Sequence, residues 1–458
     1  MADSSAFDIV VLGGGSGGYA CALRAAELGK SVALIEKDKV GGTCLHRGCI
    51  PTKALLHAAE VADSARESDA VGVRARFEGI DMPSVNTYKD KVIGRLFKGL
   101  QGLIKSRKIT VVEGEGRLVS PTEVRVGDTV YHGEHVVLAT GSRPKTLPGL
   151  EIDGQRVITS DEALRLERVP RSVVILGGGV IGVEFASVWR SFGAEVTIVE
   201  MLPHLVPTEE ESSSKLLERA FRRRGIAHKL GVKFAGAKTT DSGVVVELEN
   251  DEPLEAELLL VATGRGPVSD DLGYEDVGVR MDRGLVVVDE HCRTSVPTIS
   301  AVGDLIATPQ LAHVGFAEGI NVAERVAGLS PAPVDYDGVP RVTYCEPEVA
   351  SVGITSQQAR ERGYEINEVT YDLGANGRSQ ILQTQGAVKV IAAKDGPVLG
   401  VHMVGSRVGE LVAEGQLIYN WEALPSEVAQ LIHPHPTQSE AVGEAHLALA
   451  GKPLHTHS

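Results

Sequence analysis

The sequence predicts an α/β protein built from two similar parallel-sheet units followed by a C-terminal α+β domain. Three observations support this fold class. A glycine-rich turn follows a buried strand near the N-terminus, a second copy of the same pattern occurs 164 residues later, and the sequence texture changes after Pro331 and Pro333. At 458 residues, the chain is long enough for about three domains.

Composition narrows the class of function. The chain is 43% hydrophobic but only 4% aromatic, contains 52 glycines and carries a formal net charge of −15. This acidity argues against nucleic acid or an anionic membrane as a partner. Five cysteines are too few for a disulfide-stapled secreted fold. The first apolar run begins at Phe7 and no run is long enough to span a bilayer, so we expect a cytoplasmic protein without a signal peptide.

The first unit has the features of a Rossmann-like, dinucleotide-binding fold in the expected order. Its glycines permit a tight turn, close approach of a pyrophosphate and helix–sheet packing. The phosphates are expected at the helix N-terminus, and the ribose hydroxyls at an acid that closes the second strand. A glycine fingerprint alone would also fit a simple glycine-rich turn. The features are a strand at 7–12, Gly13, Gly15 and Gly18, a helix to about residue 29, a strand at 31–35, and Glu36.

The same pattern recurs at one constant offset, which favours two dinucleotide sites in one chain. A strand at 173–176 corresponds to the strand at 9–12. Six further positions match, namely Gly177, Gly179, Gly182, Ala186, Gly193 and Glu200, each 164 residues after Gly13, Gly15, Gly18, Ala22, Gly29 and Glu36.

The second acid also indicates which nucleotide is bound. Glu200 is followed by Met201-Leu202-Pro203-His204, without arginine or lysine. A 2′-phosphate beside this carboxylate would meet like charge, worth roughly 4 kcal/mol at contact for an effective dielectric of about 20. The second site therefore favours NAD over NADP.

Two cysteines are the candidate chemical centre. Cys44 and Cys49 lie five residues apart, with Gly48 between them and Pro51 just after them, ahead of an apolar helix-like run. Cysteines at the positive end of a helix have lowered thiol pKa values and are reactive. We interpret them as a redox pair that cycles between disulfide and dithiol. The alternatives are two buried small hydrophobic residues or a metal clip, although no second ligand pair lies nearby, and we predict no metal site.

The stretches between and after the repeats suggest cofactor contacts and domain limits. Asp304 follows a buried strand, where an acid can hold a cofactor's sugar-like chain, although a plain turn aspartate is the alternative. A helix beginning at Leu311-Ala312-His313 could face an electron-rich ring with its N-terminus. Lys89, Lys91, Arg95 and Lys98 are expected on a solvated helix face. The predicted domain segments are 1–146, 147–270, 271–340 and 341–458.

The C-terminal domain carries a second candidate chemical site. Runs at 386–393 and 397–404 flank Lys394-Asp395-Gly396, which predicts a hairpin. Later, prolines hold His435 in a loop ahead of Glu440. The carboxylate could orient His435 as a base, whereas the alternative is a capping box from Thr437 to Glu440 for the last helix.

Together these residues resemble the pyridine nucleotide–disulfide oxidoreductases, from about Phe7 to Leu454. The most specific elements are Gly-Gly-Thr-Cys44-x4-Cys49-Ile-Pro-x-Lys53, the paired fingerprints, Gly303-Asp304 and the ending at His435 and Glu440. The residues His46-Arg47 stand where many relatives carry Asn-Val. The resemblance implies FAD on the first fingerprint and NAD on the second, so the domains are FAD-binding, NAD-binding, a second FAD-binding part and a dimerisation domain.

The resemblance also implies residue roles. Cys49 would lie against the flavin and Cys44 would exchange with substrate. Lys53 would sit near the flavin ring, paired with Glu184. His435, with Glu440 behind it, would come from the other subunit of a homodimer. The implied FAD residues are Gly13, Gly15, Gly18, Glu36, Lys53, Gly116, Thr140, Gly141, Asp304, Leu311, Ala312 and His313. The implied NAD residues are Gly177, Gly179, Gly182, Glu184, Glu200, Val232 and Gly264.

The activity implied by the resemblance is oxidation of protein-bound dihydrolipoamide with NAD⁺. The implied partners are the lipoyl domains and acyltransferase core of 2-oxoacid dehydrogenase complexes, or a glycine-cleavage assembly. Two alternatives stay open at this point. The chain could be an NADH-dependent reductase of another disulfide, or a mainly structural subunit of such a complex.

Overall fold

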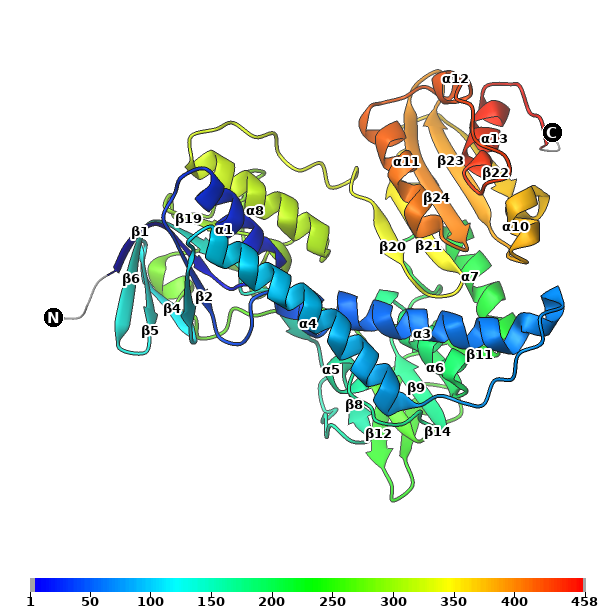
Figure 1. The fold of residues 1–458 in the computed structure, drawn as a ribbon, viewed down its shortest axis with the longest axis horizontal. Coiled ribbons are helices and arrows are strands. Elements are labelled where there is room, and N and C mark those ends of the chain that lie inside the picture. The colour runs from blue at the N-terminus through cyan, green and yellow to red at the C-terminus, as the bar shows by residue number, and fades with distance from the viewer. Residues whose placement is uncertain (1–4, 456–458) are drawn as a thin grey trace. The chain divides into compact units, whose positions relative to one another are not determined.

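The computed structural model describes residues 5–455, which form two compact units (Figure 1). The first comprises the residues up to Ala54 together with Pro83–Lys145 and Gly264–Tyr336. The second comprises Leu55–Met82, Thr146–Thr263 and the residues from Asp337 onward. Each unit is therefore assembled from separate stretches of sequence. The domain limits at 146, 270 and 340 stay predictions.

A seven-stranded sheet forms the centre of the first unit. In order across the sheet its strands are β3 (Thr110–Glu113), β2 (Val32–Glu36), β1 (Ser5–Leu12), β6 (Thr129–Leu138), β5 (Glu123–Val126) and β4 (Gly116–Ser120), with β19 (Ile299–Ala301) also paired to β6. The strands β1, β2, β3, β6 and β19 run parallel, whereas β5 pairs antiparallel with β6 and β4. Ile9, Val10 and Val11 are fully buried, as is typical of a central parallel strand covered on both faces.

Two helices of the first unit pack closely because glycines line their contact. Helices α1 (Ser16–Glu27) and α8 (Ala312–Val326) lie side by side (Figure 1). A Cβ at Gly319 would lie 2.2 Å from the carbonyl oxygen of Gly17, so only glycine allows this approach. The other helices of the first unit are α2 (Gly42–His46), most of α4 (Met82–Ser106), and the 3₁₀ helices η2 (Glu275–Val277) and η3 (Gly303–Leu305). Helix α3 (Cys49–Glu67) begins in the first unit and continues into the second, which also contains the 3₁₀ helix η1 (Ser68–Val71). Two short ribbons complete the first unit, β7 (Ser142–Pro144) with β16 (Arg265–Pro267), and β17 (Met281–Asp282) with β18 (Leu285–Val286).

The second unit begins with a five-stranded parallel sheet. Its strands in order are β11 (Ile226–Leu230), β10 (Glu195–Glu200), β9 (Ser172–Leu176), β15 (Leu258–Val261) and β8 (Val157–Ile158). A three-stranded antiparallel sheet accompanies it, with β12 (Phe234–Thr239), β13 (Val244–Leu248) and β14 (Leu254–Ala256). The helices are α5 (Ser160–Ala163), α6 (Val180–Phe192) and α7 (Glu211–Arg224).

The rest of the second unit is an antiparallel sheet with helices. Its strands in order are β20 (Arg341–Thr343), β21 (Glu348–Gly353), β24 (Val398–Gly405), β23 (Ala387–Ala393) and β22 (Ile366–Asp372). The predicted hairpin is present as β23 and β24, and Asp395 in its turn has a φ of 56°. The α/β prediction with a C-terminal α+β part is confirmed. The helices are α9 (Ser356–Glu361), η4 (Leu373–Ala375), α10 (Gly377–Ile381), α11 (Val408–Asn420), α12 (Pro425–Val428) and α13 (Glu440–Leu449).

The sequence repeat is reproduced in backbone geometry. Gly13 and Gly177 have φ values of 109° and 107°, which L-residues with side chains rarely adopt. A Cβ at Gly18 would lie 1.9 Å from the carbonyl oxygen of Gly13, and a Cβ at Gly182 would lie 1.9 Å from that of Gly177. The third glycine of each fingerprint is thus required for the helix to pack against its own turn.

One surface expectation was wrong. Lys89 in α4 is only 5% exposed, and its Nζ lies 2.8 Å from Oδ1 of Asn86. The long aliphatic stem of lysine allows such burial while the ammonium keeps a polar partner. Lys91 and Lys98 are not buried. Within residues 5–455, no helix combines the length and the apolar character needed to cross a bilayer.

We expect Gly319→Ala to destabilise the first unit. The added methyl group would meet the backbone of Gly17 in α1, so the two helices must separate. Overpacking of this kind typically lowers the free energy of unfolding by about 1–3 kcal/mol. Urea unfolding followed by circular dichroism measures the change.

The matched control is Gly99→Ala in α4, where nothing lies within 4 Å of the added Cβ. This substitution should stabilise the protein by up to about 1 kcal/mol, because alanine loses less backbone entropy than glycine in a helix. Equal urea concentrations at the unfolding midpoints of the two variants would contradict a tight glycine contact between α1 and α8.

Candidate active site

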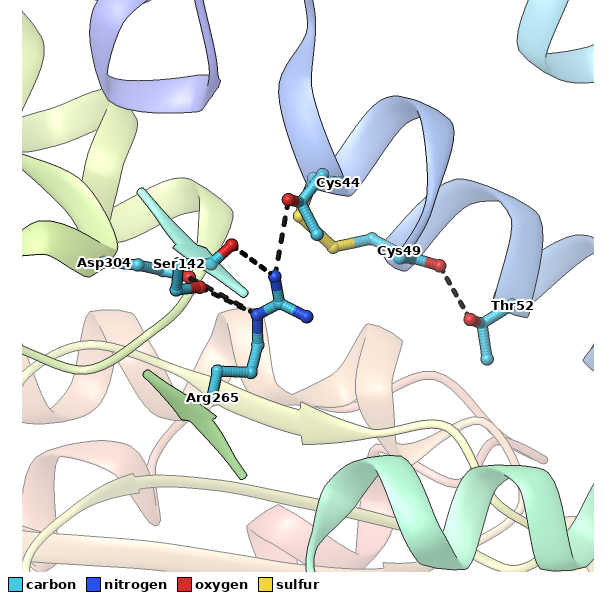
Figure 2. The surroundings of a disulfide bond; sticks show 8 residues. Cys44, Cys49, Thr52, Ser142, Arg265 and Asp304 are labelled. Atoms are coloured by element: carbon cyan, nitrogen blue, oxygen red, sulfur yellow. Dashed lines mark hydrogen bonds and ion pairs between the residues drawn. A yellow bond between two sulfur atoms is a disulfide. The ribbon is translucent and has the colours of Figure 1, made fainter. Parts of the chain in front are cut away.

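Cys44 and Cys49 form a disulfide (Figure 2). Cys44 lies in the short helix α2, and Cys49 is the first residue of the 19-residue helix α3. Their Cα atoms are 4.6 Å apart, within the usual range for a bridged pair. The N-terminus of a helix stabilises a thiolate through its dipole and its N–H groups. The pairing confirms the redox interpretation over two separate buried thiols or a metal clip.

The disulfide segment is held against the first fingerprint by backbone contacts. Gly41 N–H donates to the carbonyl oxygen of Gly14 at 2.8 Å. Gly42 has a φ of 58°, and a Cβ there would lie 2.6 Å from the Cα of Gly15. Only glycine permits this approach. The sulfur pair is therefore placed directly beside the turn that is expected to hold a pyrophosphate.

The two residues that lie between Leu45 and Gly48, His46 and Arg47, both anchor the disulfide segment. His46 Nε2 lies 2.9 Å from the carbonyl oxygen of Val40, and because a carbonyl only accepts, Nε2 carries the hydrogen. The His46 ring meets Phe97 of α4 edge-on, with ring centroids 5.0 Å apart. Arg47 forms an ion pair with Asp38. His46 and Arg47 thus tie the disulfide segment to its own unit.

The first fingerprint presents a cradle of the kind that a dinucleotide needs. Gly15 caps the N-terminus of α1, and a Cβ there would meet nothing within 4 Å, so there is open space before the helix N–H groups. Glu36 accepts hydrogen bonds from Gly14 N–H at 2.7 Å and from Asp38 N–H at 2.9 Å. A carboxylate has about four acceptor positions, so Glu36 keeps capacity for ribose hydroxyls.

The second fingerprint repeats these contacts residue for residue. Gly179 caps α6 and also faces open space. Glu200 accepts from Gly178 N–H at 2.6 Å and from Leu202 N–H at 2.8 Å. Val232 N–H donates to the carbonyl oxygen of Glu200 at 3.1 Å, and Gly264 has a φ of 112° with open space at its Cβ position.

Polar groups meet at the carboxyl ends of β6 and β19. Ser142 Oγ donates to Asp304 Oδ2 at 2.5 Å. Arg265 Nε donates to Ser142 Oγ at 2.7 Å (Figure 2). The turn that carries Asp304 is held by the fully buried Glu318, whose Oε2 accepts from Gly303 N–H at 2.7 Å. Asp304 is therefore a held carboxylate rather than a plain turn residue.

Other predicted FAD residues surround this edge of the sheet. Thr140 Oγ1 donates to the carbonyl oxygen of Val268 at 2.6 Å, and Gly141 follows it with a φ of 70°. Leu311 is the N-cap of α8, so Ala312 and His313 form its first turn. Gly116 begins β4, where a Cβ would lie 2.5 Å from Leu12. A side chain at position 116 would therefore have to displace the side chains of the sheet that pack around it.

The predicted partner Lys53 belongs to the first unit and Glu184 to the second. Glu184 is only 3% exposed and accepts from Tyr344 N–H at 2.9 Å. Lys53 lies in the second turn of α3. The pairing of Lys53 with Glu184 stays a prediction.

The histidine–carboxylate pair of the second unit has the predicted geometry. His435 Nδ1 lies 2.9 Å from Glu440 Oε1, and Thr437 N–H donates to Glu440 Oε2 at 2.8 Å. Burial opposes ionisation of Glu440, but these two hydrogen bonds outweigh it and lower the pKa of the carboxyl. The geometry agrees with Glu440 as the orienting carboxylate. The predicted capping box from Thr437 to Glu440 is wrong, because α13 begins at Glu440 with Ser439 as its N-cap and without a side-chain cap.

A second histidine–carboxylate pair in the same loop was missed from the sequence. His433 Nε2 lies 2.7 Å from Glu414 Oε1 of α11, and this hydrogen bond raises the pKa of His433. A Cβ at Gly443 of α13 would lie 2.5 Å from His433 Nδ1, so the ring packs closely against that helix. The spacing His-Pro-His was the available signal, but its partner Glu414 lies 19 residues earlier.

A family model described as pyridine nucleotide-disulphide oxidoreductase matches residues 7–319, and the dimerisation domain of the same family matches residues 339–446. The chain belongs to this family. Among curated relatives, dihydrolipoyl dehydrogenase of Bacillus subtilis is 42% identical, over 98% of this chain and 99% of the relative. Mitochondrial dihydrolipoyl dehydrogenase of Pisum sativum is 40% identical, over 98% and 92%. Leghemoglobin reductase of Glycine max is 39% identical, over 98% and 88%.

Solved structures agree with this membership. LpdA of Mycobacterium tuberculosis superposes with a TM-score of 0.90 at 26% identity, covering 97% of this chain and 99% of that protein. The flavoprotein disulfide reductase RclA of Escherichia coli superposes with a TM-score of 0.87 at 28% identity, covering 96% and 99%.

This pyridine nucleotide–disulphide oxidoreductase is a flavoprotein that uses FAD and NAD, and it forms a homodimer through its C-terminal domain. The two open cradles before α1 and α6 fit two dinucleotides, because each offers helix N–H groups without a Cβ in the way. The resemblance predicted from sequence is confirmed.

We expect this oxidoreductase to react with NADH at least tenfold faster than with NADPH at equal concentration. The carboxylate of Glu200 would lie beside the extra phosphate and repel it. Glu200→Gln should lower the ratio of the NADH rate to the NADPH rate, because the amide carries no charge. Stopped-flow reduction with each nucleotide measures both values.

Glu195→Gln is the control, because Glu195 begins the same strand β10 with an exposed side chain. It should leave the nucleotide preference unchanged. A wild-type preference for NADPH would show that Glu200 does not select the nucleotide.

Proposed function

We propose that this chain oxidises protein-bound dihydrolipoamide to lipoamide with NAD⁺. The Cys44–Cys49 disulfide at the start of α3 is the observation that carries the proposal. The chain's similarity to proteins named dihydrolipoyl dehydrogenase, over nearly its whole length, supports the choice of substrate.

The sulfur chemistry is a pair of exchange steps. A substrate thiolate attacks Cys44 Sγ, the Cys44–Cys49 bond breaks, and Cys49 leaves as a thiolate at the helix N-terminus. The second thiolate of the same substrate then attacks the substrate sulfur that is bonded to Cys44. The substrate disulfide forms, the bond to Cys44 breaks, and Cys44 leaves as a thiolate. The substrate has lost two electrons and two protons, and the cysteine pair has gained the two electrons. Bound FAD and NAD⁺ supply the acceptors for those electrons.

His435 of the partner subunit is the proposed base. Its Nδ1 hydrogen is committed to Glu440, so Nε2 is the nitrogen that can take a thiol proton. The carboxylate also stabilises the positive ring that results. Because His435 and its carboxylate lie only five positions apart, in a loop and at the start of the helix that follows it, the pair is oriented before any substrate arrives.

The remaining predicted residues have cofactor roles in this proposal. Residues that would hold FAD are Gly13, Gly15, Gly18, Glu36, Lys53, Gly116, Thr140, Gly141, Asp304, Leu311, Ala312 and His313. Residues that would hold NAD are Gly177, Gly179, Gly182, Glu184, Glu200, Val232 and Gly264. The open space at Gly15 and Gly179 supports the two phosphate positions.

The proposed partners are lipoyl domains and the acyltransferase core of 2-oxoacid dehydrogenase complexes, or a glycine-cleavage assembly. A reducing, cytoplasmic setting suits the chain, since Cys21, Cys292 and Cys345 are buried free thiols.

His435→Gln should lower dihydrolipoamide oxidation roughly a hundred- to ten-thousandfold, the usual contribution of a positioned base. The amide keeps the size of the side chain but cannot take a proton. Steady-state NAD⁺ reduction with dihydrolipoamide measures the loss.

The matched control is His57→Gln. His57 also lies beside a carboxylate, with Nδ1 3.2 Å from Glu60 Oε2, but on the exposed face of α3. It should retain wild-type turnover. Near-normal turnover of His435→Gln would remove His435 from the proposed mechanism.

Cys44→Ser separates the proposed enzyme from the alternatives. Lipoamide turnover should fall to background, while electrons from NADH should still reach an artificial dye. A mainly structural subunit would instead support its complex unchanged. For the wild-type protein, faster NADH-dependent reduction of glutathione disulfide than of lipoamide would favour another disulfide as substrate.

A further inference from the structure

Arg265 lies where three segments of the first unit meet beside the disulfide (Figure 2). Its Nη2 donates to the backbone oxygen of Ser142 at 2.7 Å and to Thr43 Oγ1 at 3.4 Å. Its Nε donates to Ser142 Oγ at 2.7 Å and lies 3.9 Å from Asp304 Oδ2. The guanidinium thus contacts the residue before Cys44 and approaches the carboxylate after β19.

These contacts are not needed to hold the short ribbon on which Arg265 lies. The strands β16 and β7 already pair through their backbones, and Lys145 N–H donates to the carbonyl oxygen of Gly264 at 3.0 Å. On the opposite strand, Arg143 pairs with Asp270 and its side chain is 60% exposed. The side chain of Arg265 is only 13% exposed.

A guanidinium this far from water must find partners for its N–H groups. Arg265 finds them in groups that belong to the site. Thr43 directly precedes Cys44, and Ser142 donates to Asp304 at 2.5 Å. One side chain therefore joins the disulfide segment to the acid that is expected to hold the sugar chain of FAD.

We propose that Arg265 is a positioning residue that fixes the segment at Thr43 relative to Asp304 and favours the reduced state of the Cys44–Cys49 pair. The proposal rests on the proposed redox function of that pair. It assigns Arg265 no direct contact with substrate.

The positive charge of the guanidinium stabilises one redox state of the pair more than the other. The disulfide is neutral, whereas its two-electron reduction breaks the S–S bond and leaves thiols that can ionise to thiolates. A fixed positive charge lowers the free energy of the thiolate and leaves that of the disulfide unchanged. Removing the charge should therefore shift the equilibrium toward the disulfide.

The test is a redox titration of the FAD-loaded protein in mixtures of reduced and oxidised dithiothreitol. Reduction of the pair converts one dithiothreitol to its cyclic disulfide, so electrons and protons balance. Alkylation followed by peptide mass measurement reports Cys44 and Cys49 separately from the other thiols. Burial raises the pKa of Cys21 and Cys292 to about 12, so those thiols stay protonated and react slowly.

Arg265→Gln should shift the equilibrium roughly tenfold toward the disulfide, as expected for the loss of one nearby charge at an effective dielectric of about 20. Arg265→Lys should retain most of the wild-type value because it keeps the charge. Arg143→Gln removes an exposed charge from the same ribbon and should have no effect. An unchanged equilibrium in Arg265→Gln, or an equal shift in Arg143→Gln, overturns the proposal.

Thr43→Val decides the matter if Arg265→Gln fails to fold. It removes one of the two acceptors of Nη2 at nearly constant volume, and the guanidinium is then no longer held against the disulfide segment. The substitution should shift the same equilibrium by roughly two- to fivefold in the same direction, since one charge-assisted hydrogen bond is lost. No shift in this variant also overturns the proposal. The titration needs no lipoyl substrate, so its outcome is independent of whether dihydrolipoamide is the physiological reductant.

Discussion

The first unit depends on a close contact between two backbone segments that meet at glycines, where neither segment carries a side chain. Gly42 lies so close to Gly15 that a Cβ would fall 2.6 Å from its Cα. This contact places the disulfide segment against the turn proposed to hold a dinucleotide phosphate. Because backbone atoms move less than side chains, the position of the disulfide segment relative to this turn is fixed by backbone packing rather than by rotamers.

The second unit repeats the way in which an acid holds its glycine turn. Glu200 accepts from Gly178 and Leu202 as Glu36 accepts from Gly14 and Asp38. Each acid therefore stabilises its own glycine turn, whether or not a nucleotide is bound. The two copies differ in the residues that follow the acid. In the first copy these residues are charged, and in the second they are apolar. Their shared part explains binding of a dinucleotide, and the part that differs can distinguish one nucleotide from the other.

The sequence predicted the features that are encoded locally. Both fingerprints, the cysteine pair, the hairpin at Asp395 and the His435–Glu440 pair each lie within a short stretch. The contacts of Arg265 were not predicted, because Ser142 lies 123 positions away and Thr43 lies 222 positions away. The burial of Lys89 was missed for a related reason. The pattern of charged and apolar residues along one helix does not show which other parts of the chain will cover a given charged side chain.

The division of chemistry between the units depends on how each group is oriented. The cysteine pair itself lies in one short stretch, but its placement against the first glycine turn joins separate stretches of the chain and so depends on the folded first unit. The proposed proton-handling pair needs only one short stretch of chain, in which Glu440 binds His435 with one oxygen and Thr437 with the other. A group oriented by its own loop can be supplied by another subunit without losing its geometry. In the proposed mechanism, dimerisation has to fix only the position of one preformed element, which is a smaller entropic demand than assembling the pair across an interface.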